Sequence, residues 1–188
     1  MSRGRIVIVS GPPGAGKSAV ARRLAETADG PLATHLHTDD FYAYIRKGYV
    51  PPWRPESRAQ NTVVLDALAA TAAIYAKGGY DVFADGIVGP WFFDPWLAAA
   101  ASATLDLRYV LLLPDEATTV ARATSRRPPA LTDPQAVRFM WRQFAQLDAY
   151  ADHAVDTSRL TIDEALALIE AGLADGRFRL SASTAGAN

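Results

Sequence analysis

The stretch from Gly11 to Ser18 limits the possible fold of this chain more than any other segment. It reads GPPGAGKS and fits the pattern G-x-x-x-x-G-K-[ST], with an apolar, β-branched run at 5–10 before it and a helical segment at 17–28 after it. Glycines let the backbone curve so that successive N–H groups point at one anion, and the positive end of the new helix faces the same anion. The segment therefore predicts a strand, a phosphate-binding loop and a helix in direct succession.

Two side chains of this loop have the chemistry needed to bind Mg-ATP. Lys17 is expected to reach the β- and γ-phosphates, and the hydroxyl of Ser18 is expected to be a ligand of Mg²⁺. The positions of this segment that we expect to contact ATP are Gly11, Gly14, Ala15, Gly16, Lys17, Ser18 and Ala19.

Composition and charge exclude several other classes of protein. The chain has 188 residues, enough for one domain with one sizeable core, and its formal net charge is −1. No overall positive charge draws it to nucleic acid or to an anionic membrane, and no apolar run approaches the ~20 residues of a membrane-spanning helix. There is no cysteine, so disulfides and thiolate catalysis are excluded. Because the first strand leaves no room for a signal peptide, we expect a cytoplasmic protein.

Apolar patterns and breakers predict strands that alternate with helices. Such alternation is typical of a parallel sheet covered on both faces, a three-layer α/β/α fold, here as one domain over 1–180 with a frayed tail at 181–188. Strands are expected at 5–10, 33–37, 80–84, 105–113 and 153–157. Helices are expected at 17–28, 62–77, 94–101, 115–126 and 134–150, and a last one after the capping box of Thr161 and Glu164. Residues 46–61 are expected to form a long surface loop.

Acidic side chains follow the second and third predicted strands. Ligands of parallel sheets bind beyond the carboxyl ends of the strands, so Asp39, Asp40 and Asp85 should lie near the phosphate loop. A hydroxyl that receives a phosphoryl group needs a carboxylate to accept its proton, and Asp39 is our first choice for this base. Alternatively, one of the pair caps the short helix that follows, with Asp40 as the cap or in the outer sphere of Mg²⁺. Asp85 is a candidate Mg²⁺ ligand through water, or else part of an ordinary Asp-Gly turn.

Three arginines flank the helix break after the fourth predicted strand. Arg122 and Arg126 are i,i+4 neighbours, so both can face one anion, and Arg127 follows directly. Guanidinium groups suit the oxygens of a transferring phosphoryl group, and a break between two helices can act as a hinged lid. The alternative is a solvated basic turn at a helix C-terminus. We expect at least one of the three to act in catalysis.

Aromatic residues near the same edge are candidate walls of an acceptor pocket. The loop 91–96 is the first source, and the segment 42–54 is the second. Trp141 and Phe144 are expected in the core instead. The residues predicted to contact the acceptor are Tyr42, Trp53, Arg54 and Trp91.

Two histidines alternate along the second predicted strand. His35 and His37 therefore point to the same face of the sheet. No partner cluster of cysteine, histidine or acid accompanies them at metal-ligand spacing. We expect structural histidines here and reject a transition-metal site.

Together, these motifs resemble the small P-loop kinases of the nucleoside monophosphate kinase-like group. The run TDDFY at 38–42 is similar to the acidic-aromatic signature of uridine and nicotinamide riboside kinases, whose first aspartate is the base, matched here by Asp39. Chloramphenicol phosphotransferase and zeta toxins resemble the chain in size and layout and also carry an aspartate base after strand two. The stretch 155–158 resembles a turn near the adenine in chloramphenicol phosphotransferase, which adds Thr157 to the expected ATP contacts. The resemblance implies the strand order 2-3-1-4-5, an arginine-bearing lid, and ATP and Mg²⁺ as cofactors.

The leading hypothesis is a phosphotransferase that moves the γ-phosphoryl group of ATP to a hydroxyl of a small antibiotic-, sugar- or metabolite-like molecule, as a monomer or homodimer. One alternative keeps the fold and takes a nucleoside or nucleotide as acceptor. A different class of alternative is a nucleotide-dependent switch or partner-binding ATPase. The chain has neither an N-K-x-D motif nor a D-x-x-G motif after the third strand, so a Ras-type GTPase is not expected. The near-neutral charge disfavours a nucleic-acid acceptor, and no membrane partner is expected.

Overall fold

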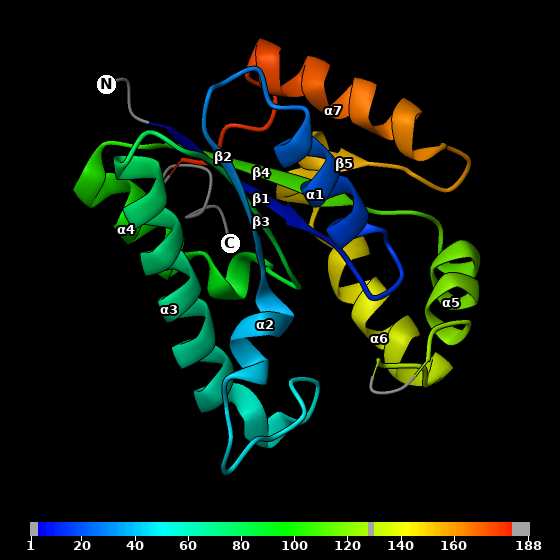
Figure 1. The fold of residues 1–188 in the computed structure, drawn as a ribbon. Helices are drawn as coiled ribbons and strands as arrows, with labels where there is room; N and C mark the ends of the chain where they lie inside the picture. Colours follow the sequence, from blue (N-terminus) through cyan, green and yellow to red (C-terminus); the bar gives the residue numbers. More distant parts are fainter. Residues whose placement is uncertain (1–3, 128–129, 182–188) are drawn as a thin grey trace.

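A computed structural model describes residues 4–127 and 130–181 and contains one parallel sheet between two layers of helices (Figure 1). The sheet has five strands in the order β2-β3-β1-β4-β5, and every neighbouring pair is parallel. The strands are β1 (Arg5–Ser10), β2 (Ala33–His37), β3 (Asp81–Asp85), β4 (Asp106–Leu112) and β5 (Ala154–Val155). Both the predicted fold class and the strand order are confirmed.

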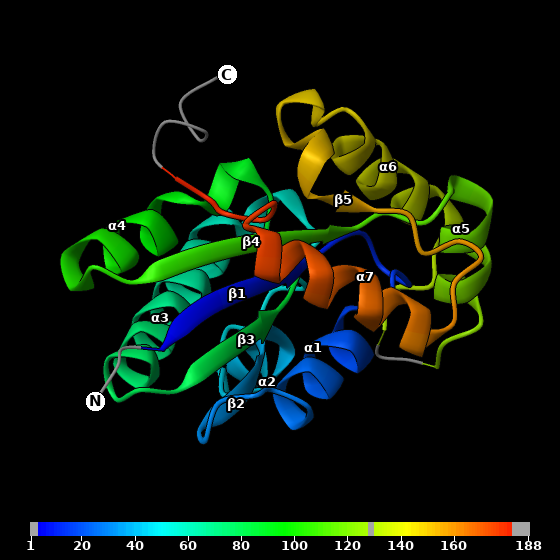
Figure 2. The same ribbon diagram turned by 90° about the horizontal axis from the view of Figure 1, so that it is seen from above.

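The helices divide between the two faces of the sheet and its carboxyl edge. Helices α1 and α7 cover one face, α3 and α4 cover the other, and α5 and α6 stand beyond the carboxyl ends of the strands (Figures 1 and 2). Their bounds are α1 (Lys17–Glu26), α2 (Thr38–Ala43), α3 (Arg58–Lys77), α4 (Asp94–Ala103), α5 (Glu116–Thr124), α6 (Pro134–Ala145) and α7 (Ile162–Asp175). Short 3₁₀ turns lie at Pro55–Ser57, Pro90–Phe92 and Asp148–His153.

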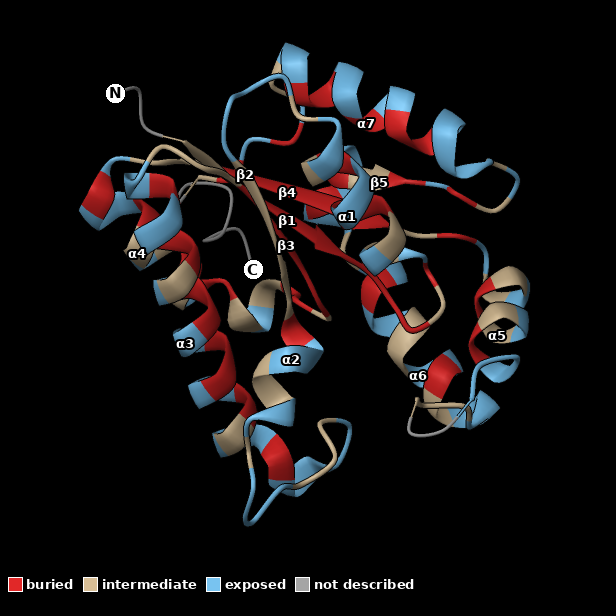
Figure 3. Cartoon of the chain, viewed as in Figure 1, coloured by how far each residue is buried: buried red, intermediate tan, exposed pale blue. Residues whose placement is uncertain are grey.

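Alternation along the central strand builds a separate core on each face. Ile6 and Ile8 of β1 pack with α3 and α4, whereas Val7 and Val9 pack with α1 and α7. Figure 3 shows the resulting pattern: the central strands are buried, the edge strand β2 is intermediate, and the helices that cover the sheet are buried on their inner sides and exposed on their outer sides. A strand buried on both faces is necessarily apolar throughout, which explains the uninterrupted run IVIV.

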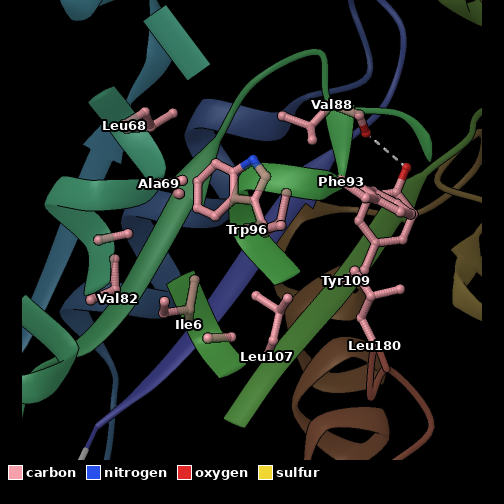
Figure 4. Packing of buried hydrophobic residues seen from close by; sticks show 14 of the residues in the cluster. Ile6, Leu68, Ala69, Val82, Val88, Phe93, Trp96, Leu107, Tyr109 and Leu180 are labelled. Carbon is pink, nitrogen blue, oxygen red and sulfur yellow. Dashed lines mark hydrogen bonds between the residues drawn. The ribbon is translucent and has the colours of Figure 1, made fainter. Parts of the chain in front are cut away.

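Half of the aromatic loop after β3 belongs to the core rather than to a pocket. The side chain of Trp96 is fully buried, and Phe93 packs edge-on against Tyr109 with ring centroids 4.8 Å apart (Figure 4). The hydroxyl of Tyr109 donates to the carbonyl of Val88 at 3.0 Å, which ties the loop to β4. Predicting the whole loop 91–96 as an acceptor wall was therefore wrong for Phe93 and Trp96.

The predicted loop 46–61 ends earlier than expected, because α3 begins at Arg58. Its first turn follows the 3₁₀ turn Pro55–Ser57, in which Ser57 Oγ donates to the carbonyls of Pro52 and Arg54. The first inward residue of the helix is Asn61, which is buried through hydrogen bonds and not through an apolar stripe. A search for apolar periodicity misses such a start.

The second helix after β4 is also shorter than predicted. Helix α6 ends at Ala145, and a 3₁₀ turn then buries Tyr150 and His153. Strand β5 covers only two residues of the predicted 153–157. Phe144 is in the core as expected, whereas Trp141 is only half-buried and donates from Nε1 to the carbonyl of Pro114 at 2.8 Å.

Side chains cap some of the helix N-termini, and the predicted capping box is one of these caps. Thr161 and Glu164 form the capping box of α7, and Asp115 caps α5 by accepting from the N–H of Thr118. Asp94 does not cap α4, because it is already the first residue of the helix. Apart from residue 181, the predicted tail 181–188 lies outside the described residues. Within residues 4–127 and 130–181, we find no helix with both the length and the apolar character needed to cross a membrane.

Candidate active site

The phosphate loop joins β1 to α1 through three glycines with positive φ. Gly11, Gly14 and Gly16 have φ values of 144°, 83° and 93°, where other residues are strained. A Cβ on Gly14 would lie 2.8 Å from the carbonyl of Thr119, so the loop also packs directly against α5. Gly16 is the N-cap of α1 and supplies no side-chain cap, which leaves the first N–H groups of this helix available to an anion.

Lys17 lies half-buried in this loop. Its Nζ donates to the carbonyl of Pro12 at 2.9 Å. Burial lowers the pKa of Lys17 to about 8, an effect that the charges of Asp85 and Asp39 oppose and that of Arg126 reinforces. Because burial destabilises the charged ammonium, a phosphate that pairs with it would stabilise it strongly.

Ser18 and Asp85 meet beside the loop. Val9 of β1 pairs with Asp85 in β3, so the carboxylate lies at the carboxyl edge, where Ser18 Oγ donates to its Oδ2 at 2.7 Å. The side chain of Asp85 is only 1% exposed. Burial alone would raise its pKa, but hydrogen bonds from His35, His37 and Ser18 outweigh burial and hold the pKa well below its usual range.

These two oxygen donors fit Mg²⁺. Octahedral Mg²⁺ with bonds of about 2.0–2.1 Å separates adjacent ligands by roughly 3 Å, close to the observed distance between Ser18 Oγ and Asp85 Oδ2. With either residue binding directly or through water, the ion would lie next to the phosphate loop. The structure thus brings together the predicted pair Ser18 and Asp85.

The histidines of β2 do have an acidic partner, contrary to prediction. His37 pairs with Asp85 across the two strands, so both side chains and that of His35 project from the same face. His35 Nε2 lies 2.6 Å from Asp85 Oδ1, and His37 Nδ1 lies 3.0 Å from the same oxygen. The predicted absence of a partner cluster was wrong, because the partner comes from a strand 48 residues farther along the chain.

Asp39 lies at the start of α2, with its carboxylate 73% exposed. His37 Nε2 lies 3.5 Å from Asp39 Oδ2. Hydrogen bonding to Asp39, and then to Asp85, raises the pKa of His37 to about 10, and the same contact with His37 lowers the pKa of Asp39. Asp39 is therefore ionised, accessible and close enough to Lys17 to influence its pKa.

Asp40 differs from its neighbour. Its side chain is exposed and forms no ion pair with any residue in the described ranges. The N-cap of α2 is His37, and no side chain caps this helix. The alternative reading, in which one aspartate of the pair caps the helix, is therefore contradicted.

The arginines of the predicted lid are not gathered around one anion. Arg122 donates from Nη2 to the carbonyls of Thr157 and Ser158 at 3.2 and 3.3 Å, which joins α5 to the turn after β5. Arg126 is exposed just past α5 and close enough to Lys17 to affect its pKa, and Arg127 is exposed beside it. Thr157 is buried, and its Oγ1 has no hydrogen-bond partner among the described residues.

Tyr42, one of the predicted acceptor contacts, uses its hydroxyl to hold a neighbouring loop in place. Its hydroxyl donates to Asn61 Oδ1 at 2.9 Å, and Asn61 Nδ2 donates to the carbonyl of Pro52 at 2.8 Å. Burial raises the pKa of Tyr42. This network fixes the loop before α3 onto α2. Sequence reasoning missed Asn61, since a lone asparagine at a helix start carries no motif.

The remaining predicted acceptor contacts are exposed. Trp53 and Arg54 lie on the surface of the loop before α3. Trp91, 42% exposed, packs against Phe144 with ring centroids 5.5 Å apart. It also lines a cavity of about 440 Å³ between α3 and α4, together with Arg58, Thr62, Leu65, Asp66, Phe92, Asp94, Pro95 and Ala98.

A second cavity of about 440 Å³ lies between α1 and α7. Its walls include Arg5 at the start of β1 and Asp29 beyond the end of α1. This places it at the opposite end of the sheet from the phosphate loop. It contains none of the predicted site residues.

Comparisons with known proteins agree with this geometry. A family model described as an AAA domain (AAA_33) matches residues 6–155. No curated protein matches the chain in sequence.

Solved structures share the fold at low identity. The tunicamycin resistance protein of Deinococcus radiodurans aligns with a TM-score of 0.65 and 16% identity over 91% of this chain and 96% of its own. The APS kinase CysC of Mycobacterium tuberculosis, in complex with AMPPNP and APS, aligns with a TM-score of 0.65 and 20% identity over 93% and 99%. A gluconokinase from Sinorhizobium meliloti 1021 aligns with a TM-score of 0.64 and 18% identity over 94% and 95%. The resemblance to small P-loop kinases is thus confirmed at the level of the fold.

Proposed function

This chain belongs to the AAA domain family (AAA_33), and we propose that it is an ATP- and Mg²⁺-dependent kinase that transfers the γ-phosphoryl group to a hydroxyl of a small molecule. One observation carries the proposal. A continuous series of contacts leads from Ser18 through Asp85 and His37 to Asp39, over distances of 2.7, 3.0 and 3.5 Å. It connects the expected metal ligand to an exposed carboxylate that can meet an acceptor.

The phosphate loop and Lys17 hold the nucleotide in this proposal. The uncapped N–H groups of α1 bind the β- and γ-phosphates, and the ammonium of Lys17 leaves the carbonyl of Pro12 for a phosphate oxygen. Mg²⁺, held by Ser18 with Asp85, neutralises the charge on the phosphate oxygens when it is bound. Arg126, exposed and close enough to Lys17 to affect its pKa, adds positive charge where the phosphoryl group transfers.

Asp39 orients the acceptor hydroxyl. The hydroxyl donates its hydrogen bond to the carboxylate, its oxygen bonds to the γ-phosphorus as the bond to ADP breaks, and the proton passes to Asp39. The lowered pKa of Asp39 makes it a weak base. In a loose transition state the attacking oxygen gains little positive charge early, so orienting the hydroxyl matters more than basicity.

The acceptor is expected to bind on the α3 side of Asp39. Trp91 offers an accessible aromatic surface, and the neighbouring cavity between α3 and α4 adds polar groups from Arg58 and Asp66. Such a mixture of one aromatic surface and a few polar groups is typical of small-ligand sites. One of the similar structures is named an APS kinase and another a gluconokinase, so their names do not indicate one common acceptor.

The test is release of ADP from Mg-ATP by the purified chain in the presence of candidate acceptors. The panel contains sugars and sugar acids, nucleosides, aminoglycoside and phenicol antibiotics, and sugar nucleotides, with the Lys17→Met variant as the blank. We expect one class to stimulate ADP release, with a mass increase of one phosphate on the acceptor. Tight ATP binding without stimulation by any class would reject the proposal in favour of a nucleotide-dependent switch.

A further inference from the structure

The two imidazoles of β2 converge on one carboxylate oxygen. His35 Nε2 lies 2.6 Å and His37 Nδ1 3.0 Å from Asp85 Oδ1, while the other oxygen, Oδ2, accepts from Ser18. His37 Nδ1 also lies 3.1 Å from Oδ2, so His37 spans both oxygens of the carboxylate, whereas His35 contacts Oδ1 alone. Two imidazoles and one buried carboxylate are a donor set that proteins use to bind transition metals.

The spacing of these donor atoms suits a single ion. One ligand atom from each of His35, His37 and Asp85 lies within 4.8 Å of the other two. A tetrahedral ion with bonds of about 2.0–2.1 Å separates its ligands by roughly 3.3 Å, so small side-chain rotations convert the hydrogen-bonded cluster into a coordination sphere. Register fixes the cluster, because His37 and Asp85 are paired residues of adjacent strands.

Asp39 provides an independent sign of a metal site. A histidine that ligates a metal usually donates its second ring N–H to a carboxylate, which orients the ring. His37 has this arrangement, with Nδ1 facing Asp85 and Nε2 lying 3.5 Å from Asp39 Oδ2. A histidine held between a buried ligand and an outer carboxylate is thus already aligned for coordination.

We propose that His35, His37 and Asp85 form a binding site for a divalent transition-metal ion of the Zn²⁺ and Co²⁺ class, with Asp39 as a positioning residue. Imidazole nitrogens select such ions over Mg²⁺, which prefers oxygen donors. The site shares Asp85 with the Mg²⁺ position at Ser18 but adds two imidazole nitrogens, and its metal binding is measured without nucleotide. A negative result of the metal-binding test would therefore not count against the proposed kinase activity.

Titration of untagged protein with Co²⁺ tests the site, because visible d–d bands report coordination. The chain has no cysteine, so thiolates cannot contribute to binding or to the spectrum. We expect one Co²⁺ per chain, displaced by Zn²⁺, with binding lost in His35→Ala and in His37→Ala. Asp39→Asn should weaken Co²⁺ binding by roughly 10- to 100-fold, whereas Asp40→Asn, the exposed neighbour, should leave it unchanged. Absence of Co²⁺ binding, or equal binding by the histidine variants, would overturn the proposal.

A measurement on the unmodified chain keeps the test decisive if a variant does not fold. The chain has three histidines, and the third, His153, is buried with Nδ1 bonded to the carbonyl of Tyr109 at 2.9 Å. One equivalent of Zn²⁺ should shift the ring NMR signals of two histidines and leave those of the third unchanged. Three unchanged rings would show that the cluster binds no metal and only holds Asp85 in place.

Discussion

Replacing Lys17 with methionine should separate the stability of the fold from its ability to bind ATP. The side chain keeps its length and loses its charge and its hydrogen bond to Pro12, whose carbonyl still accepts from the N–H of Ala15 at 3.2 Å. The shift of the Lys17 pKa from 10.5 to about 8 indicates that burying the ammonium costs up to about 3 kcal/mol without nucleotide. The nucleotide-free variant should therefore melt at the same temperature as the wild-type chain or higher.

With ATP bound, the wild-type chain should become more stable than Lys17→Met. A ligand at 100 times its Kd stabilises the folded state by about 2.7 kcal/mol, which raises Tm by roughly 5–10 °C for a chain of this size. Differential scanning fluorimetry with Mg-ATP should show this rise for the wild-type chain and none for Lys17→Met. Lys77→Met, an exposed lysine at the end of α3, is the matched control and should keep the full rise. An ATP-induced rise that survives in Lys17→Met would refute the assignment of the phosphate site, and a Tm several degrees lower without ATP would refute the burial argument.

Two further predictions concern the pKa of Lys17, and a third concerns the cap of α7. Only the charged form of Lys17 pairs with phosphate. The ATP affinity measured by calorimetry should therefore fall above pH 8, by up to about tenfold per pH unit. An ATP affinity that stays constant up to pH 9 would contradict the lowered pKa of about 8. The stability of the nucleotide-free chain should instead rise above pH 8, because the unfolded chain keeps Lys17 protonated up to 10.5 and binds more protons than the folded chain. Thr161→Ala removes the side-chain cap bonded to Glu164, so thermal denaturation should show that the free energy of unfolding falls by about 1 kcal/mol. The rise of Tm with ATP should not change. An unchanged free energy of unfolding would mean that the cap does not stabilise the fold.

The sequence predicts the order of strands and helices well, because this order follows from local patterns. A phosphate loop requires a strand before it and a helix after it, and the apolar run of β1 requires helices on both faces. The same logic places Ser18 and Asp85 at one edge. Their contact in the structure agrees with that placement.

Burial within the aromatic loop could not be predicted from residue type. Trp91 and Trp96 are five residues apart, yet one is 42% exposed and the other fully buried. Trp96 lies in α4 and packs in the core, whereas Trp91 lies in the 3₁₀ turn before that helix. Which face of α4 is buried is determined by its packing against α3, and the local sequence does not show it.

Contacts that depend on strand register were also beyond the sequence. The partnership of His35 and His37 with Asp85 needs β2 and β3 to pair with His37 opposite Asp85. A shift of one residue would send the histidines to the other face. Likewise, the i,i+4 spacing of Arg122 and Arg126 could not predict that Arg122 donates to the carbonyls of Thr157 and Ser158, which are distant in the sequence.

The central claim is that Asp39 orients a hydroxyl for attack on ATP, and the most direct test is transfer of labelled γ-phosphate to the acceptor found in the panel. Asp39→Asn should lower this transfer by ~10²–10⁴ and leave ATP binding largely intact, because the carboxylate is exposed and lies outside the phosphate loop. Asp40→Asn, the adjacent exposed control, should transfer phosphate at the wild-type rate. Equal transfer by Asp39→Asn and the wild-type chain would contradict the account.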